Sequence, residues 1–325
     1  MYFRPEQVLE QYEIEVKSIS KGRECYLCET NLGIKALKEY NGSKERAQFL
    51  VRMLVFLEQA GLNVETVMTT KEGEIFSLDE EEQKYILVNT YRGAECDAKS
   101  EEDMRCAVKM LAILHGESER FQEEVPSFLM TDSDRLFLLY EKHNRELRLV
   151  RNYIRSKKKK SGFEELFMSQ YAGYYKKAEA VTALLKEADA SNVRRGFCHG
   201  DFNQHNLIFA KEGSAIVNME NYSYQFQIAD LANFLRKMME KNNWNIKTGM
   251  DLLECYNRER ALRKEEFCYL YFYLAYPEKF WKIANHYNQS HKTWLSERDR
   301  EKLERVTGQE LQKEQFLQSF YRQFF

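Results

Sequence analysis

The chain has 325 residues, of which 43% are hydrophobic and 31% charged, and its net charge is −2. At roughly 150 residues per domain this length predicts two domains or lobes. The near-neutral charge gives no global field that would attract nucleic acid or an anionic membrane. With only 3 Pro and 14 Gly, collagen-like and low-complexity classes are excluded. No apolar run approaches the ~18 residues of a membrane-spanning helix.

Two further features predict a protein that is made and kept inside a cell. The first residues, MYFRPEQVLEQYEIEV, carry acidic groups where a secretory signal needs an apolar stretch. The seven cysteines are an odd number, which favours a reducing compartment over a disulfide framework. Cys25 and Cys28 lie in a predicted strand, where residues three apart point to opposite faces, so we interpret them as ordinary thiols.

The first 90 or so residues are predicted to form a small antiparallel sheet with one inserted helix. Period-2 patterns and turn residues predict strands at 12–17, 24–30, 34–40, 74–78 and 85–91. Asn41-Gly42-Ser43 opens the helix, and Gly61 ends it.

The remainder is predicted to be helical, apart from one hairpin. Helices are expected from Ser100 to about 115, over 134–160, over 163–188, and from about 228 to the end. Between them, Leu207-Ile208-Phe209 and Ala215-Ile216-Val217 flank the turn at 211–213. This pattern predicts a small hairpin inside the helical part.

A catalytic-type motif directly precedes that hairpin. His199-Gly200-Asp201 is followed, after four residues, by Asn206. Phosphoryl transfer from ATP to a hydroxyl needs a carboxylate to orient the hydroxyl and accept its proton, and oxygen ligands for Mg²⁺. An Asp and an Asn five apart on one tight loop can supply the first function and part of the second. The alternative is a polar loop whose side chains bond their own backbone.

The segment from His199 to Asn206 resembles the catalytic loop of the aminoglycoside phosphotransferase and choline kinase superfamily, and Ala36-Leu37-Lys38 resembles the nucleotide-contacting lysine of the kinase fold. Four segments resemble, more closely, the CotS-type spore coat proteins of endospore-forming bacteria. They are 144–155, 199–209, 227–237 and 276–282. The resemblance implies a two-lobed α+β fold of the protein-kinase type. The small N-lobe would cover residues 1–93, and the helical C-lobe 94–325 with the catalytic-loop hairpin at 197–220.

The same resemblance implies the site residues and cofactors. Asp201 and His199 would be catalytic, and Lys38 and Asn206 would bind the nucleotide. The metal ligands would be Asn206, Asn218 and Glu220. ATP and Mg²⁺ would be the cofactors.

Three departures from an active kinase are visible in the sequence. Asn218 stands where a phosphotransferase has a metal-binding Asp, and a neutral amide is a poorer Mg²⁺ ligand than a carboxylate. Gly22 stands alone between the first two strands, so no glycine-rich loop cradles phosphate. Leu50 lies where the helix glutamate that pairs with Lys38 is expected, and Glu45 is the best substitute.

Two functions therefore remain open. One is a kinase-like coat-assembly protein, a pseudokinase with weak or absent catalysis, whose partners are other spore coat proteins. The other is an active ATP- and Mg²⁺-dependent phosphotransferase acting on a hydroxyl of a small molecule, sugar or protein. For both we expect synthesis in the cytoplasm and, from the resemblance, a place in the spore coat. We expect no nucleic-acid partner.

Two surface features are relevant to partners. The run Lys157–Lys160 follows arginines at helical spacing, which indicates a solvated amphipathic face or a site for an anionic surface. The segment 267–294 holds ten aromatic residues, which indicate either core packing or contact anchors. If the protein is a scaffold, some of these should form one exposed surface: Tyr276, Phe280, Trp281, Tyr287 and Trp294.

Overall fold

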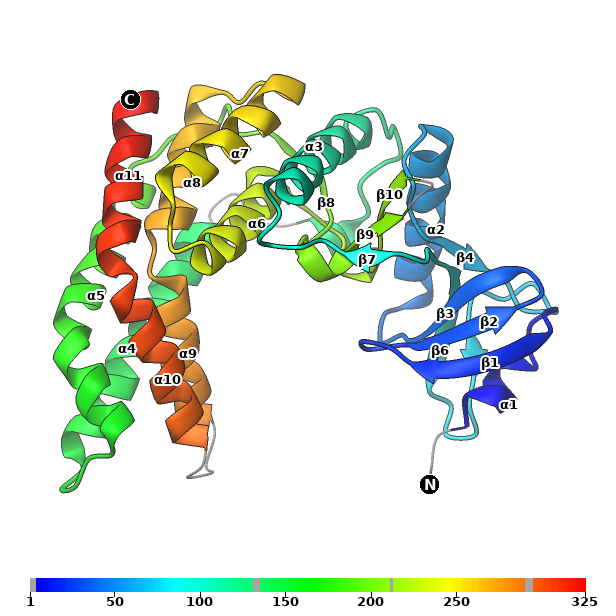
Figure 1. Cartoon of the computed structure of the whole chain (residues 1–325), viewed down its shortest axis with the longest axis horizontal. Coiled ribbons are helices and arrows are strands. Elements are labelled where there is room, and N and C mark those ends of the chain that lie inside the picture. The colour runs from blue at the N-terminus through cyan, green and yellow to red at the C-terminus, as the bar shows by residue number, and fades with distance from the viewer. Residues whose placement is uncertain (1–3, 131–134, 211–212, 290–294) are drawn as a thin grey trace. The chain divides into compact units, whose positions relative to one another are not determined.

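An antiparallel sheet followed by a larger helical part makes this an α+β protein, as Figure 1 shows. The computed structural model describes residues 4–130, 135–210, 213–289 and 295–325. Its contacts group the chain into two compact units. Unit 1 comprises residues 1–124 and 197–223, and unit 2 comprises 125–196 and 224–325. This grouping differs from the predicted lobes, 1–93 and 94–325, in placing 94–124 and the catalytic-loop segment with the sheet.

Unit 1 is built on a six-stranded sheet with the order β1-β2-β3-β6-β4 and β5 paired to β6. The strands are β1 (Val16–Lys21), β2 (Tyr26–Thr30), β3 (Gly33–Glu39), β4 (Thr66–Met68), β5 (Ser77–Leu78) and β6 (Lys84–Asn89). Two helices cover its two faces. Leu37 packs with α1 (Pro5–Leu9), and Ala36 packs with Ala47 of α2 (Lys44–Gln59). Lys38 shares the α2 side with Ala36, because side chains two apart on a strand point to one face.

The N-terminal strand prediction is largely wrong. Pro5 begins α1 at a position where its missing N–H is not needed, and β1 starts only at Val16. Tyr12, which set the alternating pattern, lies in a turn, where it is buried and its hydroxyl donates to Ser77 Oγ at 3.1 Å. The prediction for the two thiols is confirmed. Cys28 packs on the α1 face and Cys25 on the α2 face, and both are free.

The remaining elements of unit 1 lead to the catalytic-type loop. Helix α3 (Glu101–Ser118) is capped by the Ser100 hydroxyl, which accepts from Asp103 N at 3.1 Å. The predicted hairpin is present as β9 (Leu207–Ala210) and β10 (Gly213–Ile216), and β7 (Ala94–Glu95) pairs with β9. Short 3-10 turns flank it at η2 (Gln204–Asn206) and η3 (Met219–Asn221). The chain enters and leaves this part of unit 1 through β8 (Arg195–Cys198) and β11 (Ser223–Phe226).

Unit 2 is helical, as predicted. In Figure 1 the helices α4, α5, α9 and α10 run side by side. The helices of this unit are α4 (Arg135–Ser156), α5 (Gly162–Lys186), α6 (Ile228–Lys241), α7 (Ile246–Glu259), α8 (Lys264–Ala275), α9 (Glu278–Gln289), α10 (Leu295–Gly308) and α11 (Glu310–Phe324), with a 3-10 turn η1 (Ser127–Leu129) before them. No described helix is both long and apolar enough to cross a membrane.

The aromatic segment forms core rather than an exposed surface. Tyr276 and Phe280 are fully buried. Trp281 is half-buried, stacks on His143 and donates to Glu146 at 2.7 Å. Tyr287 is half-buried and stacks on Phe163. The expected contiguous exposed surface is therefore wrong for these residues, and Trp294 lies outside the described residues.

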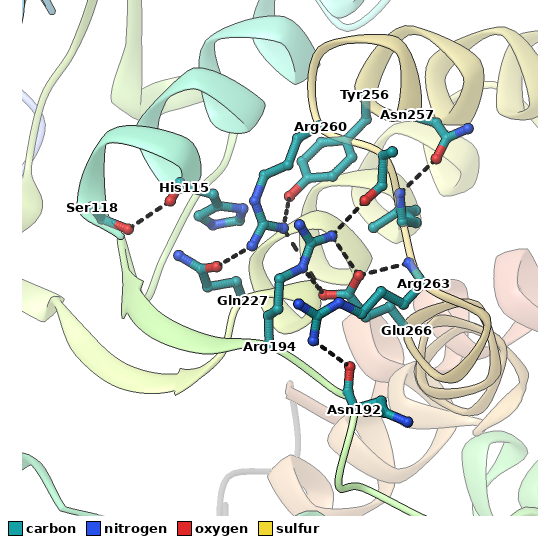
Figure 2. A network of polar contacts seen from close by, with 12 residues as sticks. His115, Ser118, Asn192, Arg194, Gln227, Tyr256, Asn257, Arg260, Arg263 and Glu266 are labelled. Atoms are coloured by element: carbon teal, nitrogen blue, oxygen red, sulfur yellow. Dashed lines mark hydrogen bonds and ion pairs between the residues drawn. The ribbon is translucent and has the colours of Figure 1, made fainter. Parts of the chain in front are cut away.

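A buried ionic network ties together the polar ends of several elements of unit 2 (Figure 2). Glu266, fully buried at the start of α8, accepts from Arg194 Nε at 2.8 Å and Nη2 at 2.5 Å. Arg260 lies 4.0 Å from the same carboxylate and donates to Gln227 Oε1 at 2.6 Å. Arg194 precedes β8 and Gln227 precedes α6, so the network fixes both ends of the chain segment that carries the catalytic-type loop.

We predict that Glu266→Ala destabilises the protein by about 3–5 kcal/mol, because the buried Arg260 and the half-buried Arg194 lose their counter-ion. Burial disfavours the Glu266 anion, but the bonds from Arg194 and the Arg263 N–H outweigh burial and lower the pKa of this carboxyl. Its stabilisation is thus present at neutral pH and lost as the pH falls below about 4.3. Urea unfolding across pH measures both effects. The neighbouring Glu265→Ala is the matched control, and an equal loss there would contradict the prediction.

Candidate active site

The centre of the site is a buried lysine held between two glutamates. Lys38 Nζ on β3 donates to Glu65 Oε2 at 2.5 Å and to Glu220 Oε1 at 2.8 Å. The side chains of Lys38 and Glu65 are only 7% and 4% exposed, whereas that of Glu220 is 21% exposed. Glu220 is therefore the more exposed of the two carboxylates.

Electrostatics keep the lysine charged. Burial disfavours the ammonium, but the two adjacent carboxylates outweigh burial and raise the pKa of Lys38. Burial raises the pKa of Glu65, the more enclosed carboxyl. Burial acts in the same direction on Glu220, but the charge and hydrogen bond of Lys38 prevail and lower the pKa of Glu220. Lys38 thus stabilises the anion of Glu220 more than that of the deeply buried Glu65.

Sequence reasoning missed Glu65 and offered Glu45 in its place, which is wrong. Glu45 is exposed in the first turn of α2. Glu65 lies between α2 and β4, where Oε1 accepts from Thr90 at 3.2 Å and Oε2 accepts from the Asn218 N–H at 2.8 Å. A lone acidic residue directly before a short strand was the available signal, but nothing local distinguishes it from a surface glutamate.

The catalytic-type loop is held by backbone-directed bonds. His199 is fully buried, and its Nε2 lies 2.9 Å from Val217 O while Nδ1 accepts from Asp201 N at 3.3 Å. Asn203 and Asn206 both donate to the Asp201 carbonyl at 2.9 Å. Gly200 has φ +83, and a Cβ there would lie 2.0 Å from Asn221 O, so only glycine fits. His199 thus positions the loop from beneath, and Asp201 is the predicted catalytic residue that reaches the open side.

The two predicted metal-ligand amides bond to each other. The Asn206 Nδ2 donates to Asp201 O, which orients the amide so that its Oδ1 faces Asn218. Asn218 Nδ2 donates to that oxygen at 2.8 Å. Asn218 adopts the left-handed backbone conformation, with φ 63 and ψ 48, which Asn tolerates better than most residues. Its backbone N–H is fixed by Glu65, so the amide pair and the Lys38 group form one network.

A cavity of about 950 Å³ opens beside this network. That volume is at the upper end for small-molecule sites. Its lining includes Lys38, Asp201, Asn206, Asn218 and Glu220, so the structure brings together five of the six predicted site residues, and His199 lies outside the lining. Three further cations also line it: Lys21, Arg23 and Arg46.

Two of these cations, Lys21 and Arg23, flank Gly22 at the turn between β1 and β2, where a glycine-rich loop would offer backbone N–H groups. Gly22 in the turn after β1 has little room for a side chain, because a Cβ there would lie 2.9 Å from Cys25 Sγ. The cavity has the volume for a nucleotide, but its four cations are balanced by four carboxylates, Glu24, Glu39, Asp201 and Glu220. Phosphate would be met by flexible cations and not by a fixed cradle of amides.

The donor set as it stands does not fit Mg²⁺. The ion favours carboxylate and phosphate oxygens in near-octahedral geometry. Here the Asn206 oxygen is already bonded by an amide N–H, Asn218 contributes its nitrogen, and Glu220 is neutralised by Lys38. The metal role of Asn206, Asn218 and Glu220, like the nucleotide role of Lys38, stays a prediction.

Comparisons with known proteins agree with this architecture. The model of the family described as "Spore coat putative kinase YutH" matches residues 5–320. Spore coat protein S of Bacillus subtilis is 23% identical over 312 residues, 94% of this chain and 88% of that protein. An aminoglycoside phosphotransferase from Alicyclobacillus acidocaldarius superimposes with a TM-score of 0.86 at 18% identity, covering 100% of this chain and 97% of that one. A spectinomycin phosphotransferase in complex with ADP and spectinomycin gives 0.67 at 16% identity, covering 94% and 97%. These solved structures confirm the predicted fold.

We predict that Asn218→Asp makes the site depend on a divalent cation. Without metal, the new carboxylate faces the Asn206 oxygen, so a hydrogen bond is replaced by repulsion between two acceptors. The midpoint of thermal unfolding in EDTA should fall by about 2–8 °C. Added Mg²⁺ should recover it and should tighten ATP binding, as calorimetry measures.

Asn31→Asp is the matched control, since it makes the same chemical change on an exposed side chain that does not line the cavity. Equal metal responses in the two variants, or none in Asn218→Asp, would show that residue 218 does not occupy a metal position.

Proposed function

Because this chain belongs to the YutH family of kinase-like spore coat proteins, we propose that it works in coat assembly with weak or absent phosphotransferase activity. Its partners are then other spore coat proteins, and binding to them is its main activity. The observation that carries this proposal is the hydrogen bond between the Asn206 and Asn218 side chains, which completes the metal position without a metal.

The energetic argument concerns what a metal would have to displace. Binding Mg²⁺ through Asn206 and Glu220 requires breaking the amide pair and drawing Glu220 away from Lys38. A typical hydrogen bond contributes about 1 kcal/mol, and one involving a charged group about 1.5–3 kcal/mol. With an Asp at position 218 there would be no amide pair to break. The carboxylate and the Asn206 oxygen are both acceptors, so they would need a cation between them. The network therefore favours the metal-free state.

A second function, an active ATP-dependent kinase of a hydroxyl-bearing acceptor, is supported by one specific observation. Asp201 lines the same cavity as Lys38, and two asparagines fix its backbone. A carboxylate in that place can orient a hydroxyl and accept its proton. Glu220 beside Lys38 could then serve as the anionic metal ligand once nucleotide phosphates contribute their own oxygens.

Thermal unfolding with ATP separates the two functions. We expect ATP to give the same shift of the unfolding midpoint in EDTA as in Mg²⁺ or Mn²⁺, because the closed amide network contributes nothing to metal binding. Asn218→Asp is the comparison variant, since it should gain a metal-dependent shift. A metal-dependent shift of the natural protein would favour the kinase.

Should phosphate transfer be found, Asp201→Ala is expected to lower turnover by at least ~10²-fold, the usual scale for loss of a general base. Nucleotide affinity, followed by calorimetry, should change little. Full turnover by Asp201→Ala would remove this residue from the mechanism.

A further inference from the structure

Charge is divided unevenly between the two compact units. Unit 1 has 17 basic and 28 acidic side chains, a net charge of −11. Unit 2 has 32 basic and 23 acidic side chains, a net charge of +9. The overall charge of −2 therefore conceals an acidic unit and a basic unit, and each unit carries a surface that is rich in its excess charge.

The excess of unit 2 is concentrated on α4 and the loop after it. Residues 135–160 contain ten basic and two acidic side chains. Residues separated by four, three, four and four positions lie along one stripe of a helix. This basic stripe consists of Leu138, Lys142, Arg145, Leu149 and Tyr153.

The basic stripe is exposed, although it contains large apolar side chains. Leu138, Leu149 and Tyr153 are 51%, 64% and 51% exposed. Lys142 and Arg145 form long i,i+4 ion pairs of 3.9 Å with glutamates of the same helix. The opposite face of α4 is buried in the core of unit 2 through Leu147, Val150 and Ile154. Exposed Tyr and Leu between Arg and Lys have the composition of a contact surface rather than of a solvated helix face.

The excess of unit 1 is concentrated where three segments meet at one end of the sheet. Gln7 of α1 donates to Glu80 at 3.2 Å, Gln11 donates to the Leu78 carbonyl at 2.7 Å, and Lys71 donates to the Glu10 carbonyl at 2.8 Å. Leu78 is 47% exposed among them. Arg4 and Lys71 are the exposed cations on the same segments. The exposed glutamates of this acidic end are Glu6, Glu10, Glu72, Glu80, Glu81 and Glu82.

We propose that the chain self-associates head to tail, with the basic stripe of one copy docked on the acidic end of a second copy. The two surfaces are complementary in charge, and each has exposed apolar side chains at its centre, Leu149 and Tyr153 on one and Leu78 on the other. A second copy supplies this complement at equal concentration and without any other component. The proposal is independent of nucleotide binding and of any phosphate transfer.

A contact between two different surfaces determines how many copies can assemble. Because the two surfaces differ, each contact leaves one basic stripe and one acidic end unoccupied, so the assembly grows until it closes into a ring or extends as a chain. An interface made by one patch on both copies would instead stop at a dimer. Species larger than dimers therefore distinguish this contact from a symmetric one.

Sedimentation velocity of the full chain tests the proposal. We expect weight-average mass to rise with protein concentration at about 20 mM salt and to return to the monomer at about 0.5 M, where charges are screened within a few ångströms. Lys142→Glu with Arg145→Glu on the basic stripe, or Glu80→Lys with Glu81→Lys on the acidic end, should each leave monomers. Lys247→Glu with Lys264→Glu is the matched control in unit 2, and it should associate like the natural protein. Unchanged unfolding midpoints would show that all variants fold.

The decisive experiment is sedimentation velocity of a mixture of the two monomeric variants. Each variant keeps one natural surface, the acidic end in the stripe variant and the basic stripe in the acidic-end variant, so the mixture should form heterotypic contacts that neither variant forms alone. A natural chain that stays monomeric at about 100 µM, and thus has a Kd weaker than roughly that value, overturns the proposal. So does a mixture that stays monomeric, or association that the reversals leave intact. Binding to anionic lipid vesicles without self-association would assign the stripe to a membrane and likewise overturn it.

Discussion

The buried Lys38 ammonium between Glu65 and Glu220 is the interaction on which the rest of the site depends. It joins a strand of the sheet, the segment after α2 and the turn after the hairpin, which are separated by 27 and 182 residues. Removing one member of a buried ion group leaves an uncompensated charge, at a cost of about 3–5 kcal/mol. Glu65 also accepts the backbone N–H of Asn218, so the same carboxylate fixes the place from which the Asn218 amide reaches Asn206. Charge in the interior thus determines hydrogen bonding at the surface of the cavity.

Asn218 illustrates how one atom changes the requirement of a site. An Asp at this position would present an acceptor to the Asn206 oxygen, and two facing acceptors need a cation between them. The amide nitrogen presents a donor, so the pair is complete without one. The loop around it remains built as a catalytic loop, with His199 buried beneath and Gly200 in a conformation that only glycine adopts readily. A scaffold that retains this geometry without the metal requirement has a preformed cavity that is independent of magnesium.

Elements that depend on a local sequence pattern could be predicted from the sequence. Contacts between residues far apart in the sequence were missed. Helix α5 was expected at 163–188 and is found at Gly162–Lys186, because a capping box and a regular apolar face define it. The catalytic-type loop was found from its spacing alone. Glu65 was missed because its partner is 27 residues away and no local period links them. The aromatic segment was interpreted partly as surface. Aromatics on every side of α8 and α9 pack against several neighbouring helices, as Tyr276 and Phe280 do.

Charge separation connects the site with assembly. A cleft that captures anionic substrates rapidly usually lies in an attractive field, but the unit that holds this cavity has a net charge of −11. Only the local cations on its lining, Lys21, Arg23, Lys38 and Arg46, oppose that field, and Lys38 is already neutralised by glutamates. The net charge of this unit therefore disfavours fast nucleotide capture. A coat component needs lasting contacts more than rapid turnover, and the uneven charge of the two units and the bonded Asn206–Asn218 pair agree with the proposed role.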